Sequence, residues 1–163
     1  MRATARRSPS ARGIGPITAE RPLGEVLEFL RALWGMNHAL ETASRRMRVR
    51  LGVTGPERMV VRLVGRYPGI SAGDLARVLL VHPSSLTALL KRLVARGILV
   101  RRTDAVDARR ALFALTPRGA AIDGIRKGTV EAALTVALAA LPARQVRATA
   151  GVLDRLTRMI EGA

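Results

Sequence analysis

Residues 71–119 carry the pattern that most constrains how this chain can fold. Two short amphipathic segments, 71–79 and 83–96, flank a tight turn, and the second is rich in small hydroxyl residues. Two stretches of roughly alternating apolar and polar residues follow at 98–102 and 110–115, which is typical of a short hairpin. A loop rich in Asp and Arg joins them. This order predicts a helix-turn-helix followed by a two-stranded wing.

Capping signals place the expected helix ends. The Ser/Thr-x-x-acidic sequences at 54–57 and 71–74 predict two capping boxes, in which a hydroxyl accepts a backbone N–H of the first turn and the acid reaches back to the cap. Gly97 stands where a helix end needs a left-handed residue. Thr116 followed by Pro117 is typical of a helix start, and we expect that helix to run to about residue 141.

Long helices are expected at both ends of the chain. From Pro22 to about residue 51, seam positions recur at intervals of three and four, and Val146, Leu153 and Ile160 mark one face of a last helix. The first helix is longer than a small DNA-binding unit needs, so we expect it to pack on other helices, such as those of a second subunit. The predicted fold is mainly α with a small β wing, in the order α-α-α-α-β-β-α-α.

The predicted organisation has four parts. Residues 1–21 hold Ser, Pro, Gly and Arg without periodicity and are expected to form a disordered basic tail. That tail either has no role or adds non-specific affinity for DNA. Residues 22–53 form an N-terminal dimerisation helix, 54–119 a winged helix-turn-helix lobe that binds DNA, and 120–163 the C-terminal dimerisation helices.

The charge balance favours a polyanionic partner. The chain has 28 Lys and Arg against 12 Asp and Glu, a formal net charge of +16, and a field of that sign attracts polyanions from a distance. Residues 56–119 alone hold 12 basic and 4 acidic residues, a net charge of +8. A soluble basic protein without such a partner is the alternative. Aromatic residues make up only 2%, too few for a platform that stacks single-stranded bases.

Other classes of function are disfavoured by what the chain lacks. It has no cysteine, which excludes disulfides and thiolate zinc sites. Its two histidines, His38 and His82, have no Ser, Cys or carboxylate at a revealing spacing, so we expect no enzyme, no metal site and no cofactor. No apolar run could span a bilayer, and none follows the basic N-terminus as a signal sequence would require. We therefore expect a cytoplasmic protein without a membrane partner.

The segment 83–96 has the two faces of a recognition helix. Its leucines at 86, 89, 90 and 93 form an apolar stripe, and small polar residues occupy the other side of its N-terminal half. That half of a recognition helix contacts base edges in the major groove. The alternative is an ordinary solvated face. The candidate DNA-binding residues of this segment are Ser84, Ser85, Thr87 and Lys91.

The loop at 104–110 is the second candidate contact with DNA. Exposed Arg109 and Arg110 suit a narrow minor groove, whose negative potential attracts guanidinium groups. Asp107 lies two residues before Arg109 and is predicted to restrain its guanidinium. Arg101 and Arg102 lead into the loop from the first strand, and we expect them to contact phosphates.

From about residue 22 to its end, the chain resembles the MarR family of transcriptional regulators. The matching residues are Leu75-Ala76, Ser84-Ser85-Leu86-Thr87, Arg92-Leu93, Arg96-Gly97-Ile98, Asp104-x-x-Asp107-x-Arg109-Arg110 and Leu115-Thr116-x-x-Gly119. The resemblance implies a homodimer built on the first and last helices. It also implies a pseudo-palindromic operator in double-stranded DNA and release by a small, often aromatic or anionic, ligand. Repression is the expected outcome of binding, and activation is the alternative.

The chain departs from that family pattern at four positions. Leu80 stands where the turn often has Gly, and Pro83 and Ala88 stand where members often carry Arg or a polar residue. Val106 replaces a frequent wing Arg. Because three of these changes remove a potential contact with DNA, we expect modest sequence discrimination or an unusual operator.

Asn37 interrupts the apolar stripe of the first helix, beside Trp34 and His38. One interpretation is an Asn that sets the register of a helix interface. The other is an effector pocket lined by Trp34, Asn37 and His38. For the whole protein, the alternative to a regulator is an architectural DNA-binding protein without a defined operator or effector. A further alternative is a module that binds only proteins.

Overall fold

The computed structural model of the chain describes residues 23–161, so the predicted basic tail at 1–21 lies outside the described residues. The chain divides into two compact units. Of the described residues, 23–37 belong to the first unit and 38–161 to the second. The helix α1 (Glu25–Leu51) contributes residues to both units. The expected long first helix is therefore present, and it ends at the residue where its apolar pattern stops.

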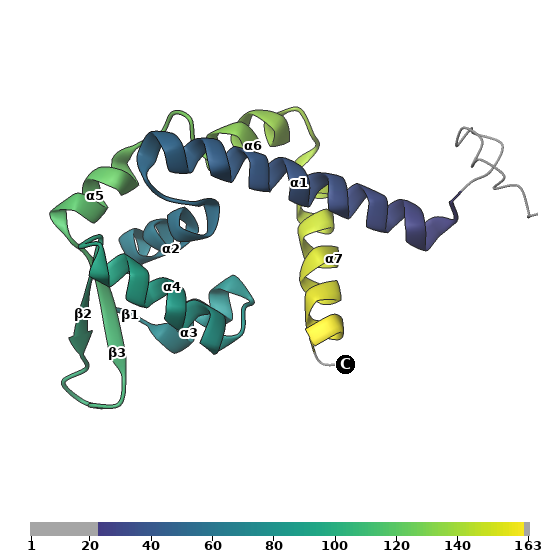
Figure 1. Cartoon of the computed structure of the whole chain (residues 1–163). Helices are drawn as coiled ribbons and strands as arrows, with labels where there is room; N and C mark the ends of the chain where they lie inside the picture. Colours follow the sequence, from purple (N-terminus) through teal and green to yellow (C-terminus); the bar gives the residue numbers. More distant parts are fainter. Residues whose placement is uncertain (1–22, 162–163) are drawn as a thin grey trace, which may run out of the picture. The chain divides into compact units, whose positions relative to one another are not determined.

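The elements after α1 confirm a mainly helical fold with a small sheet (Figure 1). In chain order they are α2 (Gly55–Arg66), β1 (Ile70–Ser71), α3 (Ala72–Leu79), α4 (Pro83–Ala95), β2 (Leu99–Thr103), β3 (Ala111–Leu115), α5 (Pro117–Gly124), α6 (Val130–Ala139) and α7 (Ala143–Glu161). The helices α3 and α4 meet at 118°, an angle typical of a helix-turn-helix. Within residues 23–161 no single helix has the length and apolar composition of a membrane span, although this bent pair would by those two criteria alone.

The wing is part of a three-stranded antiparallel sheet in the order β1-β3-β2. The expected hairpin of β2 and β3 is present, with Arg101 opposite Phe113 at its centre. The short strand β1 was not predicted, and it pairs Ile70 with Phe113 and Ser71 with Leu112. A two-residue strand has no alternation to detect in the sequence, and it forms because the free edge of β3 supplies its hydrogen-bonding partners. The two sides of β3 therefore tie the wing to the start of α3.

The prediction of one helix over residues 116–141 was wrong. α5 ends at Gly124, and α6 begins at Val130, after a five-residue linker that contains Gly128 in the left-handed region at φ +73°. Thr129 caps the new helix, because its buried hydroxyl oxygen accepts the backbone N–H of Ala132 at 3.1 Å. The residues on both sides of the break are compatible with a helix, so the periodicity of the sequence did not reveal where the helix is interrupted.

A buried guanidinium from α2 holds the end of α5. Arg58 is only 2% exposed, and it donates hydrogen bonds to the carbonyl of Ile122 and, at 2.7 Å, to that of Ile125. Its Nε also bonds Glu131 Oε1 at 2.8 Å on the first turn of α6. Burial raises the pKa of Glu131, but its own backbone N–H and Arg58 outweigh that effect, so the pKa lies below 4.5. Carbonyls that a longer helix would have bonded internally are thus satisfied by Arg58.

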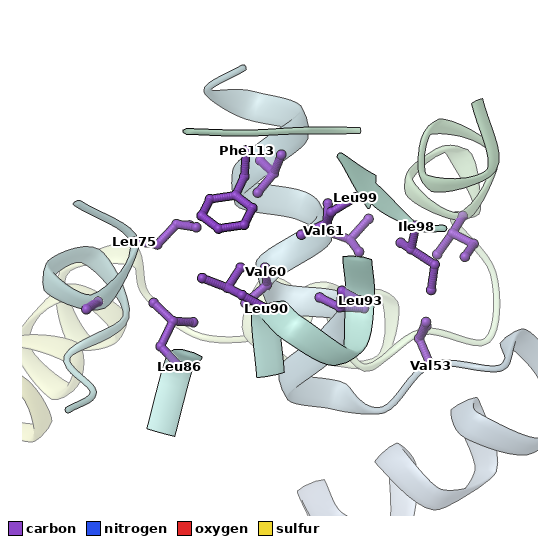
Figure 2. Close-up of a cluster of buried hydrophobic side chains, with 13 residues drawn as sticks. Val53, Val60, Val61, Leu75, Leu86, Leu90, Leu93, Ile98, Leu99 and Phe113 are labelled. Atoms are coloured by element: carbon purple, nitrogen blue, oxygen red, sulfur yellow. The ribbon is translucent and has the colours of Figure 1, made fainter. Parts of the chain in front are cut away.

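The core of the lobe lies between α2, α3, α4 and the hairpin (Figure 2). From α4, Leu86, Leu90 and Leu93 are buried as predicted, whereas Leu89 is half-buried at the edge. Burial of each such side chain contributes about 1.5–3 kcal/mol. Because the core takes one face of α4, the opposite face remains exposed along the length of the helix. The other buried members of this core are Val53, Val60, Val61, Val64, Leu75, Ala76, Ile98, Leu99, Phe113 and Ile122.

Most of the helix caps that the sequence predicted are present. Thr54 and Glu57 form a complete capping box, and Thr116 caps α5 by accepting the N–H of Gly119 at 3.1 Å. Gly97 adopts the expected left-handed conformation at φ +64°. The second expected box is incomplete, because Asp74 Oδ2 accepts a hydrogen bond from the hydroxyl of its own cap, Ser71, at 2.7 Å. The Asp side chain is one methylene shorter than the Glu of a usual box.

The turn between α3 and α4 keeps its geometry without the usual glycine. Leu80 lies in the left-handed region at φ 51°, the only non-glycine residue with positive φ within residues 23–161. Its N–H donates to Arg77 O at 3.4 Å, and the N–H of Val81 donates to Ala76 O at 3.2 Å, which is the Schellman pattern. A side chain in this conformation costs about 1–2 kcal/mol, so the substitution strains the turn without removing it.

Candidate nucleic-acid interface

The N-terminus of α4 is capped by a histidine. Both the backbone N–H and the hydroxyl of Ser84 face His82 Nδ1, at 3.3 and 2.7 Å. Because Nδ1 accepts the N–H that caps the helix, the proton of the neutral ring lies on Nε2. His82 is exposed, so this N–H is a further donor at the N-terminal end of α4. The sequence analysis did not identify His82 as a site residue.

The three predicted hydroxyl residues of α4 are all exposed, but they differ in what they can offer a ligand. Thr87 Oγ1 donates its proton to Pro83 O at 2.8 Å, which leaves only its lone pairs and its methyl group for an outside contact. The hydroxyl of Ser84 is engaged with His82. Among the described residues Ser85 has no partner for its hydroxyl, so it can both donate and accept. Such groups bind phosphates and base edges but discriminate bases weakly.

A groove of about 510 Å³ separates α4 from the hairpin. Thr87 and Lys91 line it from α4, and Arg101 lines it from β2. Its apolar lining includes Leu90 and Phe113. The structure therefore brings side chains from both predicted DNA-binding segments to one groove.

Arg101 and Arg102 do not share a face of the hairpin. Successive strand residues point to opposite sides, and directly opposed residues share a side. Arg101 is opposite Phe113, which faces the core and α4, whereas Arg102 is opposite Leu112. Both arginines are exposed, but only Arg101 lines the groove. The expected pair of phosphate contacts is thus split between two sides of the wing.

Asp107 holds the backbone of the wing tip rather than the guanidinium of Arg109. Its Oδ1 accepts the backbone N–H of Arg109 at 3.0 Å, and its carbonyl accepts the N–H of Arg110 at 2.9 Å. The guanidinium of Arg109 has no intramolecular partner in the described part of the chain. It is exposed at the end of the hairpin and is available to an anionic partner.

Arg110 forms an ion pair with Asp74 on α3, a residue that the sequence marked only as part of a capping box. Its NH2 lies 3.3 Å from Asp74 Oδ2, and Arg77 NH2 lies 2.6 Å from Asp74 Oδ1. The hydrogen bond from Ser71 and the charges of these two arginines hold the pKa of Asp74 below 3.8, although partial burial acts in the opposite direction. Asp74 therefore links the base of the wing to the helix-turn-helix. Because 36 residues separate the partners, only the fold shows the contact.

Half of the cations of the predicted DNA-binding lobe have hydrogen-bond or ion-pair partners inside the chain. Of the 12 basic residues at 56–119, six bond to carboxylates or carbonyls inside the described chain. Five of the other six lie on α4 or the hairpin, and all five are exposed. Within residues 23–161 the six without such a bond are Arg66, Lys91, Arg92, Arg101, Arg102 and Arg109.

The three residues of the predicted effector pocket all lie at exposed positions on α1. Trp34 is 77% exposed, and Asn37 and His38 are also exposed. In a single chain Asn37 therefore lies in no buried seam. Both interpretations of Asn37 need a partner or a ligand to cover it, and both remain predictions.

Comparisons with known proteins agree with this geometry. A model of the MarR family matches residues 51–110. The HTH-type transcriptional repressor Rv2887 of Mycobacterium tuberculosis is 33% identical over 106 residues, which cover 65% of this chain and 76% of the relative. The crystal structure of the MarR family transcription regulator SP03579 is similar with a TM-score of 0.63 and 25% identity, over 84% of this chain and 91% of that one. The complex of S. aureus MepR with DNA has a TM-score of 0.67 at 15% identity, over 84% of this chain and 99% of that one, and shows the fold alone.

Proposed function

The chain belongs to the MarR family of transcriptional regulators and is not an enzyme; from that premise, we propose that it binds double-stranded DNA as a homodimer and represses transcription. Its operator is a pseudo-palindrome that mirrors the two-fold axis of the dimer. Two copies of α4 enter successive major grooves about 34–36 Å apart. The relatives that are 33% identical are named repressors, which supports repression rather than activation.

The observation that carries this proposal is the placement of the cations without internal partners. Lys91 lies on α4, Arg101 lies on β2 beside it, and Arg109 lies at the wing tip. In this proposal Lys91 and Arg101 bind phosphates at the edge of the major groove, and Arg109 enters the adjacent minor groove. The hydroxyls of Ser85 and Thr87 contact base edges. Arg110 positions the wing through its ion pair with Asp74.

The terminal helices supply the proposed dimer interface, with residues 22–53 and 120–163 as the dimerisation segments. Large apolar side chains are exposed on both helices in the single chain, among them Val26 and Leu30 on α1 and Met159 and Ile160 on α7. Apolar exposure of this extent in one chain is typical of an interface with another protein. Truncating α1 should therefore yield monomers with poor affinity for DNA, which sedimentation and gel shifts can measure.

A small aromatic or anionic effector is the proposed signal for release from DNA. Trp34, Asn37 and His38 are the candidate ligand contacts on α1. Trp34 is the only tryptophan of the chain, so a change in its fluorescence reports a ligand near these residues. A candidate effector should change that fluorescence and reduce DNA affinity over the same range of concentration.

The test begins with selection of bound fragments from genomic DNA, followed by footprinting. A discrete protected palindrome is the expected result. Arg109→Ala should weaken binding to that site by about 1–3 kcal/mol, the scale of a good groove contact. Arg66→Ala is the matched control, because it removes another exposed cation, from α2 rather than from the proposed interface. Equal affinity of the two variants would exclude the wing from the mechanism.

An architectural role remains the second candidate function. It is favoured by the small polar residues of α4, because Thr87 has already donated its proton and serine discriminates bases weakly. Uniform coverage in the footprint, without a protected palindrome, would support this role. Failure to shift any duplex at low salt would instead favour a module that binds proteins.

A further inference from the structure

The tip of the wing presents an apolar side chain in a loop of charged residues. Val106 is 97% exposed, and it lies between Asp104 and Asp107 in the segment that joins β2 to β3. Single exposed apolar residues are common on proteins, so exposure alone carries no conclusion. The role of Val106 depends on whether the neighbouring polar side chains already have hydrogen-bond or ion-pair partners within the chain.

Most of the polar groups around Val106 have partners in the hairpin or in α3. Asp104 Oδ1 accepts the backbone N–H of Val106 at 2.8 Å, and Asp107 Oδ1 accepts that of Arg109 at 3.0 Å. Arg110 is held by Asp74. In the described part of the chain, the large side chains of the tip without an internal partner are thus one cation, Arg109, and one apolar group, Val106.

The tip is also held in a defined conformation. The N–H of Asp104 donates to Arg110 O at 3.0 Å, and the N–H of Arg110 donates to Asp107 O at 2.9 Å, directly beyond the last strand pair. The two aspartate side chains fix the residues between these bonds, as Asx turns do. A tip ordered before binding loses little conformational entropy when it contacts a partner.

We infer that Val106 selects A·T base pairs where the wing enters the minor groove, an inference that rests on the proposed function. The floor of the groove carries only acceptors at A·T pairs, whereas each G·C pair adds the N2 amino group of guanine. An isopropyl group pressed on that amine removes its water and offers no acceptor in return. Valine is shorter than the side chains that wedge between base steps, so it contacts the floor and sugars without a kink. Arg109 supplies the attraction, which is strongest where A·T pairs narrow the groove.

Base analogues that change only the minor groove test this inference. The probe is a duplex selected from a random-sequence pool by the full chain. Each adenine is replaced in turn by 2,6-diaminopurine, which adds an amino group in the minor groove and leaves the major-groove edge unchanged. At symmetry-related positions under the two wings we expect a loss of about tenfold, equivalent to about 1.4 kcal/mol. Replacing a guanine there by inosine should strengthen binding.

Val106→Thr is the decisive variant, because it keeps the shape of the side chain and adds a hydroxyl that can accept from the amino group. At so exposed a position it should leave the fold unchanged. The diaminopurine penalty should fall from about tenfold to less than about threefold under the wings, and penalties elsewhere should stay the same. An equal penalty in both proteins, or no sensitive position at all, would overturn the role of Val106 while leaving the regulator intact. If the pool yields no bound duplex, the proposed function fails with it.

Discussion

Gly119→Ala tests a site where a glycine lies too close to a neighbouring backbone to carry a side chain. A Cβ at this position would lie 2.2 Å from Ile98 O and 3.3 Å from Leu115 Cδ2. Carbon and carbonyl oxygen normally approach to about 3.3–3.6 Å, so α5 would have to move by about 1 Å. The start of α5 is held beside the segment before β2 by Thr116, whose N–H donates to Ile98 O at 3.1 Å and whose hydroxyl donates to Gly97 O at 2.7 Å.

The expected cost follows from those contacts. A displacement of that size breaks both Thr116 bonds, at about 1 kcal/mol each. Residual overpacking adds about 1 kcal/mol. Alanine in a helix interior offsets about 1 kcal/mol through its propensity. Gly119→Ala should therefore lower the free energy of unfolding by about 2 kcal/mol.

Urea denaturation of the full chain, followed by far-ultraviolet circular dichroism at one fixed protein concentration, measures this change. Gly124→Ala is the matched control in the same helix, because a Cβ there meets no atom within 4 Å. That variant should raise the free energy of unfolding by up to about 1 kcal/mol. If the two variants have the same stability, a side chain at position 119 does not clash with Ile98, and the reasoning is refuted.

Three further variants test other contacts by the same method. Leu80→Gly should be more stable than Leu80→Ala by about 1 kcal/mol, because only glycine relieves the positive φ; equal stabilities would contradict the strain. The hydrogen bond that Asp74 accepts from the neighbouring hydroxyl, with the nearby arginines, lowers its pKa below 3.8. Its ionised form therefore stabilises the fold above that pH, and the contribution is lost as the pH falls through the lowered value. Asp74→Asn should weaken this acid dependence, and an unchanged pH profile would exclude Asp74 as its source. Arg58→Met should cost about 3 kcal/mol, since it removes the nearest cation from Glu131 and a donor from the carbonyls of Ile122 and Ile125, whereas the half-exposed Arg62→Met should cost less than about 1 kcal/mol. Similar losses would mean that burial of Arg58 is unimportant.

Features that depend on residues a few positions apart could be predicted from the sequence. The capping box at Thr54, the cap at Thr116 and the left-handed Gly97 all satisfy backbone groups within one helical turn of themselves. The apolar stripe of α4 likewise follows from a period of 3.6 residues. These signals were sufficient to predict the helix-turn-helix, the hairpin and the exposure of the hydroxyl residues of α4.

Contacts between residues far apart in the sequence could be identified only from the tertiary structure. The break between α5 and α6 depends on Arg58, which lies 64 residues before the carbonyl of Ile122. The ion pair of Asp74 with Arg110 spans 36 residues, and it gives one of the predicted DNA-binding arginines a partner inside the lobe. No local pattern encodes either pair, because many arginines in this chain could have met those acceptors. Local chemistry therefore determined the hairpin and most helix ends, but not the break between α5 and α6. Packing in three dimensions decided which charges are neutralised inside the lobe and which face a partner.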